Sequence, residues 1–354
     1  MGMSNWWVTR GAVKTASGTS SSRLRDQQVN RVIEAASRKV ERLLHRFFIP
    51  RTETHLFRWP SRQAGESYIL WLDQDLLAVT TLQTKAQDTS PTTISSSDYF
   101  LEPSTAPHRR IEIDLSSTAA FEAGDTGQRA ISVAGRWGYS EDTASAGTVS
   151  SGLSGDAAAT TMVVSDSSLL DVGDTLLIED EQIFLKDVSS AALGSILVND
   201  GAITKDKGDN SITLDGSHGV VAGETILLDS ERLFVEGVST NVLTVIRGYD
   251  GTEVAAHVDD TAVHIFRTFT LERGANGTTA ATHADSTAIS KYVIPGDAVE
   301  LTIAEAVAML NQERGGYGQT QGGGEGQERR TESGLMILRQ EVQSSLARRR
   351  VAAV

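Results

Sequence analysis

The 354-residue chain contains no cysteine, only 6 prolines and few aromatic residues, which make up 6% of it. The absence of cysteine excludes disulfides, thiolate nucleophiles and cysteine-based zinc sites. No stretch approaches the roughly 20 apolar residues of a membrane span, and the first residues lack the charged and apolar regions of a signal peptide. With 39% hydrophobic and 22% charged residues, we expect a folded protein that is made in the cytoplasm and has no membrane partner.

The net charge of −14 is unevenly distributed along the chain. Residues 1–60 carry a net charge of +7, residues 61–149 one of −6, residues 150–300 one of −16 and residues 301–354 one of +1. Because affinity for DNA depends on cations that neutralise phosphates, the acidic centre argues against a dedicated nucleic-acid binder. It does not exclude DNA that passes nearby without binding.

A basic amphipathic helix is predicted over residues 25–48, where apolar side chains recur every three or four positions and form one stripe. Pro50 marks its end. A row of arginines projects from the opposite side: Arg31, Arg38, Arg42 and Arg46. This row is either a solvated face or a contact surface for other copies of the same chain, since arginine suits bidentate ion pairs at interfaces.

Residues 68–139 change to a β pattern. Short runs rich in β-forming residues are separated by turn residues, and Ile111, Ile113 and Leu115 alternate with Glu112 and Asp114 as in a half-buried strand. We expect a small antiparallel sheet. The small polar residues of 144–152 then indicate a spacer at a domain boundary.

The chain repeats itself beyond this spacer. Residues 173–189 match residues 223–239 at 7 of 17 positions, which indicates a duplicated supersecondary unit. A second echo relates Arg247-Gly248-Tyr249-Asp250-Gly251-Thr252 to Arg273-Gly274-Ala275-Asn276-Gly277-Thr278. We therefore expect about two and a half small β modules.

Helical patterns return at the end of the chain. Pro295 and Asp297 open one predicted helix, a glycine-rich linker spans 315–326, and a last helix precedes Arg348-Arg349-Arg350. Neither helix can bury its apolar stripe alone, so both are expected to pack with the N-terminal helix.

Catalytic patterns are scarce. His257 and His283 occupy equivalent repeat positions, which favours structural hydrogen bonding over metal ligation or acid–base chemistry. The glycines at 322–324 lack the lysine of a phosphate loop, and no carboxylate pair can be placed across a sugar from sequence alone. We expect no enzyme activity, no catalytic residues, no cofactor and no metal.

Several motifs in this order resemble the head-tail connector (adaptor) proteins of tailed double-stranded-DNA bacteriophages. They are His45-Arg46-Phe47-Phe48-Ile49-Pro50, Asp98-Tyr99-Phe100-Leu101-Glu102-Pro103, Arg110-Ile111-Glu112-Ile113, Gly135-Arg136-Trp137-Gly138-Tyr139 and the Pro-led pair of terminal helices. The resemblance covers residues 1–143 and 293–354. It implies an α+β fold, with a helical adaptor core and a small antiparallel sheet. This chain departs from the family by an all-β repeat insertion, residues 144–292, that interrupts the core between the Trp137-Gly138-Tyr139 strand and the terminal helices.

The resemblance further implies a virion neck protein. Such proteins form rings, commonly of twelve copies, between the portal and the tail, and the genome DNA passes transiently through the lumen. The expected partners are other copies, the portal protein, tail or neck proteins and, through the inserted domain, the capsid. We expect inter-subunit contacts at Arg31, Arg38, Arg42 and Arg46, and a portal-docking tail at Arg348, Arg349, Arg350, Val351 and Val354.

Two alternatives come from other classes of protein. Short β repeats often serve recognition, so the chain is alternatively a host-surface or glycan-binding module of a virion. The second alternative is a tail-tube or tail-terminator protein. Exposed aromatic clusters would favour the glycan-binding alternative, but the clearest aromatic candidate in the repeats, Tyr249, has Ala275 as its equivalent in the other repeat.

Overall fold

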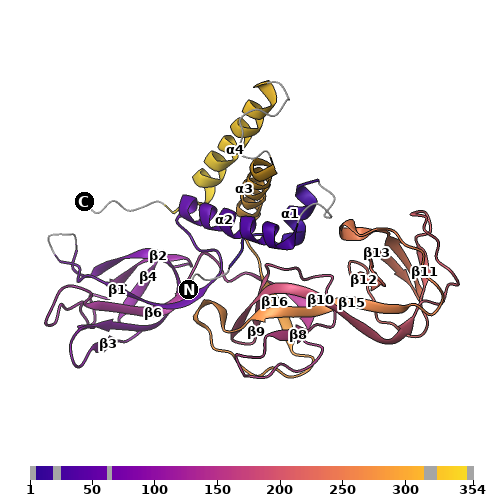
Figure 1. The fold of residues 1–354 in the computed structure, drawn as a ribbon. Helices are drawn as coiled ribbons and strands as arrows, with labels where there is room; N and C mark the ends of the chain where they lie inside the picture. Colours follow the sequence, from indigo (N-terminus) through magenta and orange to yellow (C-terminus); the bar gives the residue numbers. More distant parts are fainter. Residues whose placement is uncertain (1–4, 19–24, 62–65, 315–324, 349–354) are drawn as a thin grey trace.

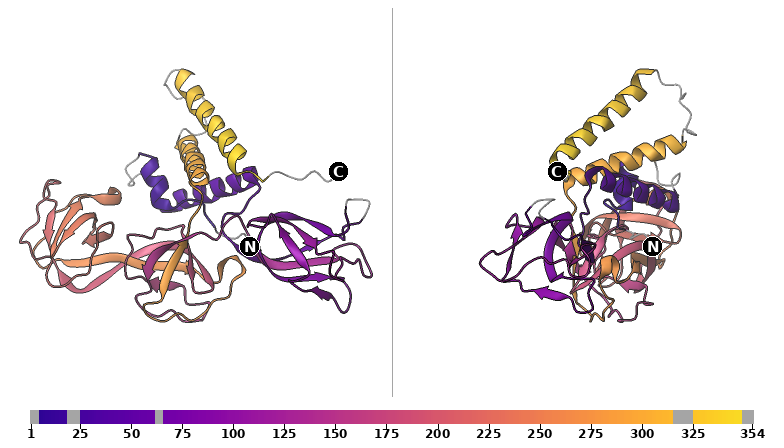
Figure 2. Two further views of the ribbon diagram at one scale, coloured as in Figure 1. Left: turned by 180° about the vertical axis from the view of Figure 1, so that it is seen from behind. Right: turned by 90° about the vertical axis from the view of Figure 1, so that its left-hand side faces the viewer.

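The computed structural model describes residues 5–18, 25–61, 66–314 and 325–348. Three β lobes lie in a row, and the helices lie on one side of that row (Figures 1 and 2). The described residues form four α-helices and two antiparallel sheets, of six and ten strands. The helices are α1 (Arg10–Ala16), α2 (Asp26–Leu44), α3 (Gly296–Arg314) and α4 (Glu325–Leu346).

The molecule is mostly β, so the prediction of a helical core was wrong. Residues 51–137 build their core within a sheet, around side chains such as Leu76, Ile111 and Trp137. The helix expected over 25–48 is observed as α2, but its apolar stripe is buried partly by the β residue Phe184. Amphipathic periodicity shows that one face of a helix is buried, and it does not show what covers that face.

The six-stranded sheet, sheet A, forms the first lobe and has the strand order β1-β6-β2-β5-β4, with β3 paired to β2. Its longest strand, β2, is continuous and has a register shift in its pairing with β5 between Trp71 and Leu76. The strands are β1 (Arg51–Phe57), β2 (Ile69–Thr84), β3 (Thr92–Ile94), β4 (Tyr99–Glu102), β5 (His108–Ile113) and β6 (Ile131–Trp137).

The ten-stranded sheet, sheet B, forms the other two lobes. Its two longest strands, β10 and β15, pair with each other and run through both lobes (Figure 1). The strands are β7 (Thr143–Thr148), β8 (Thr161–Val163), β9 (Thr175–Ile178), β10 (Glu181–Leu197), β11 (Ser211–Thr213), β12 (Thr225–Leu228), β13 (Glu231–Ser239), β14 (Val242–Ile246), β15 (Ala262–Glu272) and β16 (Ala288–Tyr292).

The two lobes of sheet B are equivalent modules, and the second is inserted into the first. We call residues 143–189 with 267–292 module 1, and residues 190–266 module 2. The β8–β15 pairing of module 1, Met162 opposite Phe269, recurs in module 2 as the β11–β14 pairing of Ile212 with Leu243. The β13–β14 hairpin of module 2 corresponds to the paired strands β10 and β15 of module 1. The chain leaves module 1 along β10, forms module 2 and then returns along β15. The offset is therefore 50 between β10 and β13, and 26 between β14 and β15. Both sequence echoes therefore belong to one pair of modules.

The segment expected to be a spacer is part of this sheet. β7 pairs with β16, and Ala146 and Val149 are fully buried in the core of module 1. Its small side chains allow close packing, and its backbone supplies the ladder hydrogen bonds. The small polar side chains therefore indicated a spacer at a place where the chain begins a module.

The N-terminal helix α2 and the C-terminal helices α3 and α4 pack together in the helical layer. Val40 and Leu44 of α2 pack with Leu301 of α3 and Val342 of α4. The buried Glu305 of α3 accepts hydrogen bonds from Lys39 (2.7 Å) on α2 and from Arg339 (2.9 Å) on α4. Residues 315–324 of the expected glycine linker lie outside the described residues.

Candidate functional site

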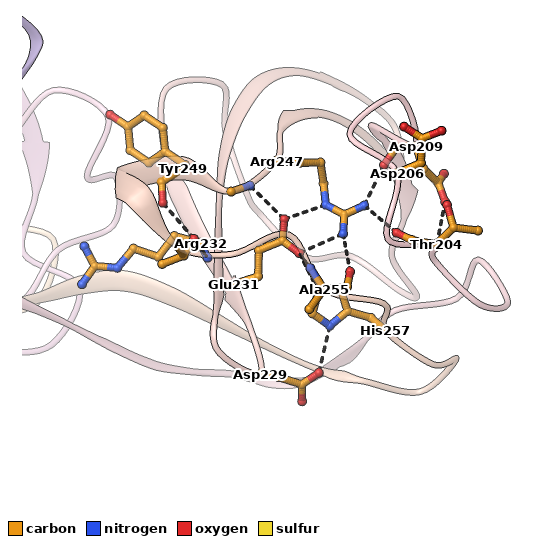
Figure 3. Close-up of polar contacts among 12 residues, drawn as sticks. Thr204, Asp206, Asp209, Asp229, Glu231, Arg232, Arg247, Tyr249, Ala255 and His257 are labelled. Atoms are coloured by element: carbon orange, nitrogen blue, oxygen red, sulfur yellow. Dashed lines mark hydrogen bonds and ion pairs between the residues drawn. The ribbon is translucent and has the colours of Figure 1, made fainter. Parts of the chain in front are cut away.

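A buried carboxylate, Glu231 at the start of β13, is the centre of module 2 (Figure 3). The Arg247 guanidinium donates to both of its oxygens, Nε to Oε1 and Nη2 to Oε2, each over 2.8 Å. Neither side chain has any solvent exposure. The backbone N–H groups of Gly248 and Ala255 donate to the same carboxylate at 2.8 and 2.9 Å, so it is saturated with donors.

The remaining groups of this cluster are also paired (Figure 3). Arg247 donates to the backbone carbonyls of Asp209 (3.0 Å) and Ala255 (2.6 Å). His257 lies between two carboxylates, with Nε2 2.9 Å from Glu231 and Nδ1 2.8 Å from Asp229. The cluster therefore joins the start of β13, the end of β14 and the loops on either side.

Module 1 contains the same cluster at equivalent positions. Glu181 accepts from Nε and Nη2 of Arg273, each over 2.7 Å, and His283 lies 2.8 Å from Glu181 and 2.7 Å from Glu179. His257 and His283 are both buried and hydrogen-bonded, which is the structural role expected from their repeated positions.

The surroundings keep both glutamates ionised. Burial by itself raises the pKa of Glu231, but hydrogen bonds from Arg247, the amide of Ala255 and His257 lower it to about 2. The same opposing causes lower the pKa of Glu181 to about 2. Among the described residues, no group of His, Asp and Glu side chains is arranged to hold a metal ion. A permanently charged, donor-saturated carboxylate is suited to fixing loops in place.

Each cluster positions a one-turn segment that we call the module tip: η3 (Ala275–Gly277) in module 1 and η2 (Tyr249–Gly251) in module 2. In both tips the central residue has a left-handed backbone, φ 56° at Asn276 and φ 50° at Asp250. Asparagine and aspartate tolerate this conformation better than most residues. The repeated Asn-Gly and Asp-Gly dipeptides thus encode the tips.

The tip of module 1 is covered by the N-terminal segment. Asn276 donates to Asn5 (3.1 Å) and to Gln182 (2.7 Å), and all three amides are buried. Next to them Trp6 packs edge-on against Phe184, with 5.3 Å between the ring centroids. A Cβ at Gly173 would lie 2.7 Å from the Trp6 ring, so this glycine allows the close approach.

The tip of module 2 meets α1 through charges. Asp250 pairs with Arg232 of its own module, and it accepts from Lys14 of α1 at 3.0 and 3.3 Å. Lys14 also pairs with Asp26 at the start of α2 (2.6 Å). The N-terminal segment and α1 therefore touch both tips, by amides in module 1 and by ion pairs in module 2.

The four arginines predicted to form an interface do not share one free face. The side chain of Arg31 is 66% exposed and pairs with Glu313 (2.7 Å), and Arg42 is exposed. Arg38, however, lies over the Trp7 ring and binds Glu41 and the carbonyl of Asn5. Arg46 is buried and pairs with Asp75 (3.0 Å). Of the four, Arg31 and Arg42 are exposed, Arg38 is partly exposed and Arg46 is buried.

The predicted portal-docking tail begins at a residue that is held by the body of the protein. Arg348 lies 3.3 Å from Asp75, and it donates to the carbonyl of Leu72 (2.8 Å). Arg349, Arg350, Val351 and Val354 lie outside the described residues. Asp75 thus links Arg46, which follows α2, to Arg348, which follows α4. Burial raises the pKa of the Asp75 carboxyl, although the two cations act to lower it.

Sequence reasoning did not identify Asp75, Lys14 or the Glu231–Arg247 pair. Glu181 and Arg273 recur in the two echoes, at different offsets, as Glu231 and Arg247. A glutamate and an arginine are thus present at the same positions in both repeats. This recurrence was the signal that could have identified the clusters. Asp75 and Lys14 lie outside the repeats and carry no comparable signal.

Comparison with known proteins found no matching family model, no similar curated protein and no similar solved structure. In the part of the chain that the structure describes, none of the helices has the length and apolar character needed to cross a membrane.

Proposed function

We propose that the chain is a structural subunit of a ring at the junction between the head and tail of a tailed bacteriophage, with the genome DNA passing through the lumen. The observation that carries this proposal is the joining of the two chain ends. The segments that resemble connector proteins, residues 1–143 and 293–354, meet through the helical layer and through the Arg46–Asp75–Arg348 ion pairs.

The charged clusters support a structural function rather than a catalytic one. Glu181 and Glu231 are saturated by donors and buried, and the only described His residues beside them are also buried. A catalytic carboxylate needs access to substrate. Groups arranged in this way contribute rigidity to the lobes that they occupy.

The shape and charge of the β lobes suit the side of a ring. The lobes lie in a row beside the helices (Figure 1), so modules 1 and 2 extend the subunit beyond the connector-like part. Residues 150–300 carry a net charge of −16, which disfavours binding to DNA phosphates. In this proposal the modules contact capsid, tail or neck proteins, and DNA moves past an acidic chain without being retained.

Negative-stain electron microscopy of the purified protein, alone and mixed with portal protein, tests the proposal. We expect rings of uniform diameter, which stack coaxially on the portal when both are present. A protein that stays monomeric and ignores the portal would contradict the proposal. Binding of that monomer to host glycans would favour the alternative of a receptor-binding module.

A further inference from the structure

The two modules present equivalent faces, and among the described residues the N-terminal segment and α1 bury only the face of module 1. We define the module-2 face by the side chains Arg232, Phe234, Ile246, Tyr249 and Phe266, which line one cleft. Phe234 and Ile246 are opposite each other in the β13–β14 register and so share one side of the sheet. Tyr249 is 38% exposed and Ile246 is 44% exposed.

The equivalent face of module 1 is a docking surface within the chain. Phe184 and Ala275 correspond to Phe234 and Tyr249, and they are only 2% and 8% exposed. They pack with Trp6, Val8 and Val13 of the N-terminal segment and α1. The duplicated unit thus has an apolar face, and in module 1 the N-terminal segment and α1 bury that face.

In module 2 the N-terminal segment stops short of this face. The Lys14–Asp250 ion pair closes one side, and beyond it the module-2 face and α1 border a cleft of about 650 Å³. The aromatic floor is partly formed by Tyr249 and Phe234, whose ring centroids are 5.1 Å apart, and Arg232 lies over the Phe266 ring.

The charged side chains of this cleft are mostly paired. Its cationic side chains are Arg10, Lys14, Lys207, Arg232 and Arg247, and its acidic side chains are Asp26, Asp171 and Asp250. Asp26 pairs with Arg10 and Lys14, Asp250 pairs with Lys14 and Arg232, and Arg247 pairs with Glu231. Lys207 is exposed. The cleft therefore suits an occupant that combines apolar or aromatic side chains with an acidic group that reaches Lys207.

Such a surface exists at the other end of the same chain. On sheet A, Trp71 is 47% exposed and Phe100 is 54% exposed. The registers place Trp71 opposite Arg110 and Phe100 opposite Glu112, so the two aromatic side chains share one face of the sheet. Glu102 lies on that face too, opposite Arg110. Arg110 lies over the Trp71 ring on this face and pairs with Glu112, which leaves Glu102 as the acidic group outside that pair. We call Trp71, Phe100, Glu102, Arg110 and Glu112 the sheet-A patch.

We propose that the sheet-A patch of one copy packs into the module-2 face of the next copy. This inference rests on the proposed ring and names a contact within it. Sheet A and module 2 lie at opposite ends of the row of lobes (Figure 1). A contact between two different surfaces of identical subunits is head-to-tail, and such contacts form a ring when the rotation from one subunit to the next closes. In this contact, aromatic side chains meet aromatic side chains, and Glu102 meets Lys207.

A pair of surface variants tests the contact. Ile246→Asp disables the module-2 face and Phe100→Asp disables the sheet-A patch, and both positions are exposed, so the fold should be retained. Each variant alone should associate at least about tenfold more weakly than the native protein, as expected for a central apolar contact. Controls are Val258→Asp, exposed in module 2 outside the cleft, and Leu56→Asp on β1, at the opposite edge of sheet A from β4.

Mixing the two variants gives the most specific result. The Ile246→Asp protein keeps an intact sheet-A patch, and the Phe100→Asp protein keeps an intact module-2 face. A mixture of the two can therefore form one intact interface, between these two surfaces. We expect a one-to-one heterodimer of twice 37.9 kDa in light scattering, whereas each variant alone is monomeric. If Ile246→Asp is insoluble, Tyr249→Ser replaces it in the same mixture.

The outcomes separate this inference from the proposed function. Unchanged rings from Ile246→Asp or Phe100→Asp would overturn the contact and leave the ring in place. A native protein that is monomeric at every concentration would overturn both. Saturable binding of a free oligosaccharide in the cleft, with no effect of either variant on assembly, would assign the cleft to glycan recognition and also overturn the contact.

Discussion

Glu231 and Arg247 form a bidentate ion pair in which neither side chain is accessible to solvent, and Glu181 and Arg273 repeat it in module 1. Burying two charges is costly unless all their hydrogen-bonding groups are satisfied. Here backbone N–H and carbonyl groups complete the partners of both side chains in module 2. The duplication has therefore preserved a complete polar unit and not only an apolar core.

Removal of the cation should destabilise module 2 strongly. Arg247→Leu leaves Glu231 buried without its ion pair, so we expect the free energy of unfolding to fall by about 3–5 kcal/mol. Arg247→Lys should recover little of this loss, because lysine lacks the planar fork that binds both oxygens. Urea unfolding with hydrogen exchange of the module-2 strands measures the effect.

The control for this prediction is an exposed pair with similar chemistry. Arg136 and Glu141 lie 2.7 Å apart on the surface, with both side chains about half exposed. Arg136→Leu should change the free energy of unfolding by less than about 1 kcal/mol. Equal losses for Arg247→Leu and Arg136→Leu would show that the buried cluster is not essential to module 2.

The low pKa values of the two glutamates predict a particular acid sensitivity. Both are lowered to about 2 in the folded protein from an ordinary value of 4.5. A depressed carboxyl pKa stabilises the folded state fully above pH 4.5, and this contribution is lost as the pH falls through about 2. We expect the Tm of the native protein to fall over this range. Glu231→Gln should be less stable at neutral pH but should show a shallower fall, and a parallel fall in both proteins would contradict the assignment.

His55 in sheet A should titrate unusually high. Burial alone lowers its pKa, but hydrogen bonds with Asp73 (3.0 Å) and Glu53 (3.2 Å) raise it to about 9. Stability from the charged imidazole is present below pH 6.5 and is lost as the pH rises through about 9. NMR titration of the imidazole measures this pKa. Asp73→Asn should lower it, and an ordinary value in the native protein would show that the two carboxylates do not hold the proton.

Two truncations separate portal docking from folding. Ending the chain after Arg348 removes only residues 349–354, so we expect native stability and weaker binding to the portal, most visibly at high salt, where the remaining ionic contacts are screened. Ending it after Ala347 also removes the partner of Asp75 and Leu72, and should lower the free energy of unfolding by about 1–3 kcal/mol. Undiminished portal binding by the first truncation would exclude the tail as a docking segment.

The periodic parts of the fold were predictable, and the parts fixed by long-range pairing were not. The apolar stripe of 25–48 predicted α2, although the helix ends at Leu44, before Pro50, because His45 adopts a left-handed conformation with φ 52°. The echoes predicted duplicated β modules. Their nesting depends on β10 and β15 running through both modules, and no local pattern encodes which distant strand each one meets.

The candidate site shows the same division. The second echo contains Asp-Gly and Asn-Gly, and those residues suit the positive φ of the tips. The covering of one tip by Asn5 and Trp6, and the exposure of the other, depend on how far the N-terminal segment reaches. The arginine row of α2 was predicted to be accessible from its spacing, but Arg46 is buried because sheet A lies against the end of that helix.

The mass of the purified native chain in solution tests the central claim most directly. Native mass spectrometry over a range of micromolar concentrations should find one closed assembly at an integer multiple of 37.9 kDa, with the same number of copies at every concentration above the association threshold. A chain of 37.9 kDa that stays monomeric throughout, or an open series of assemblies without a preferred size, would contradict the ring.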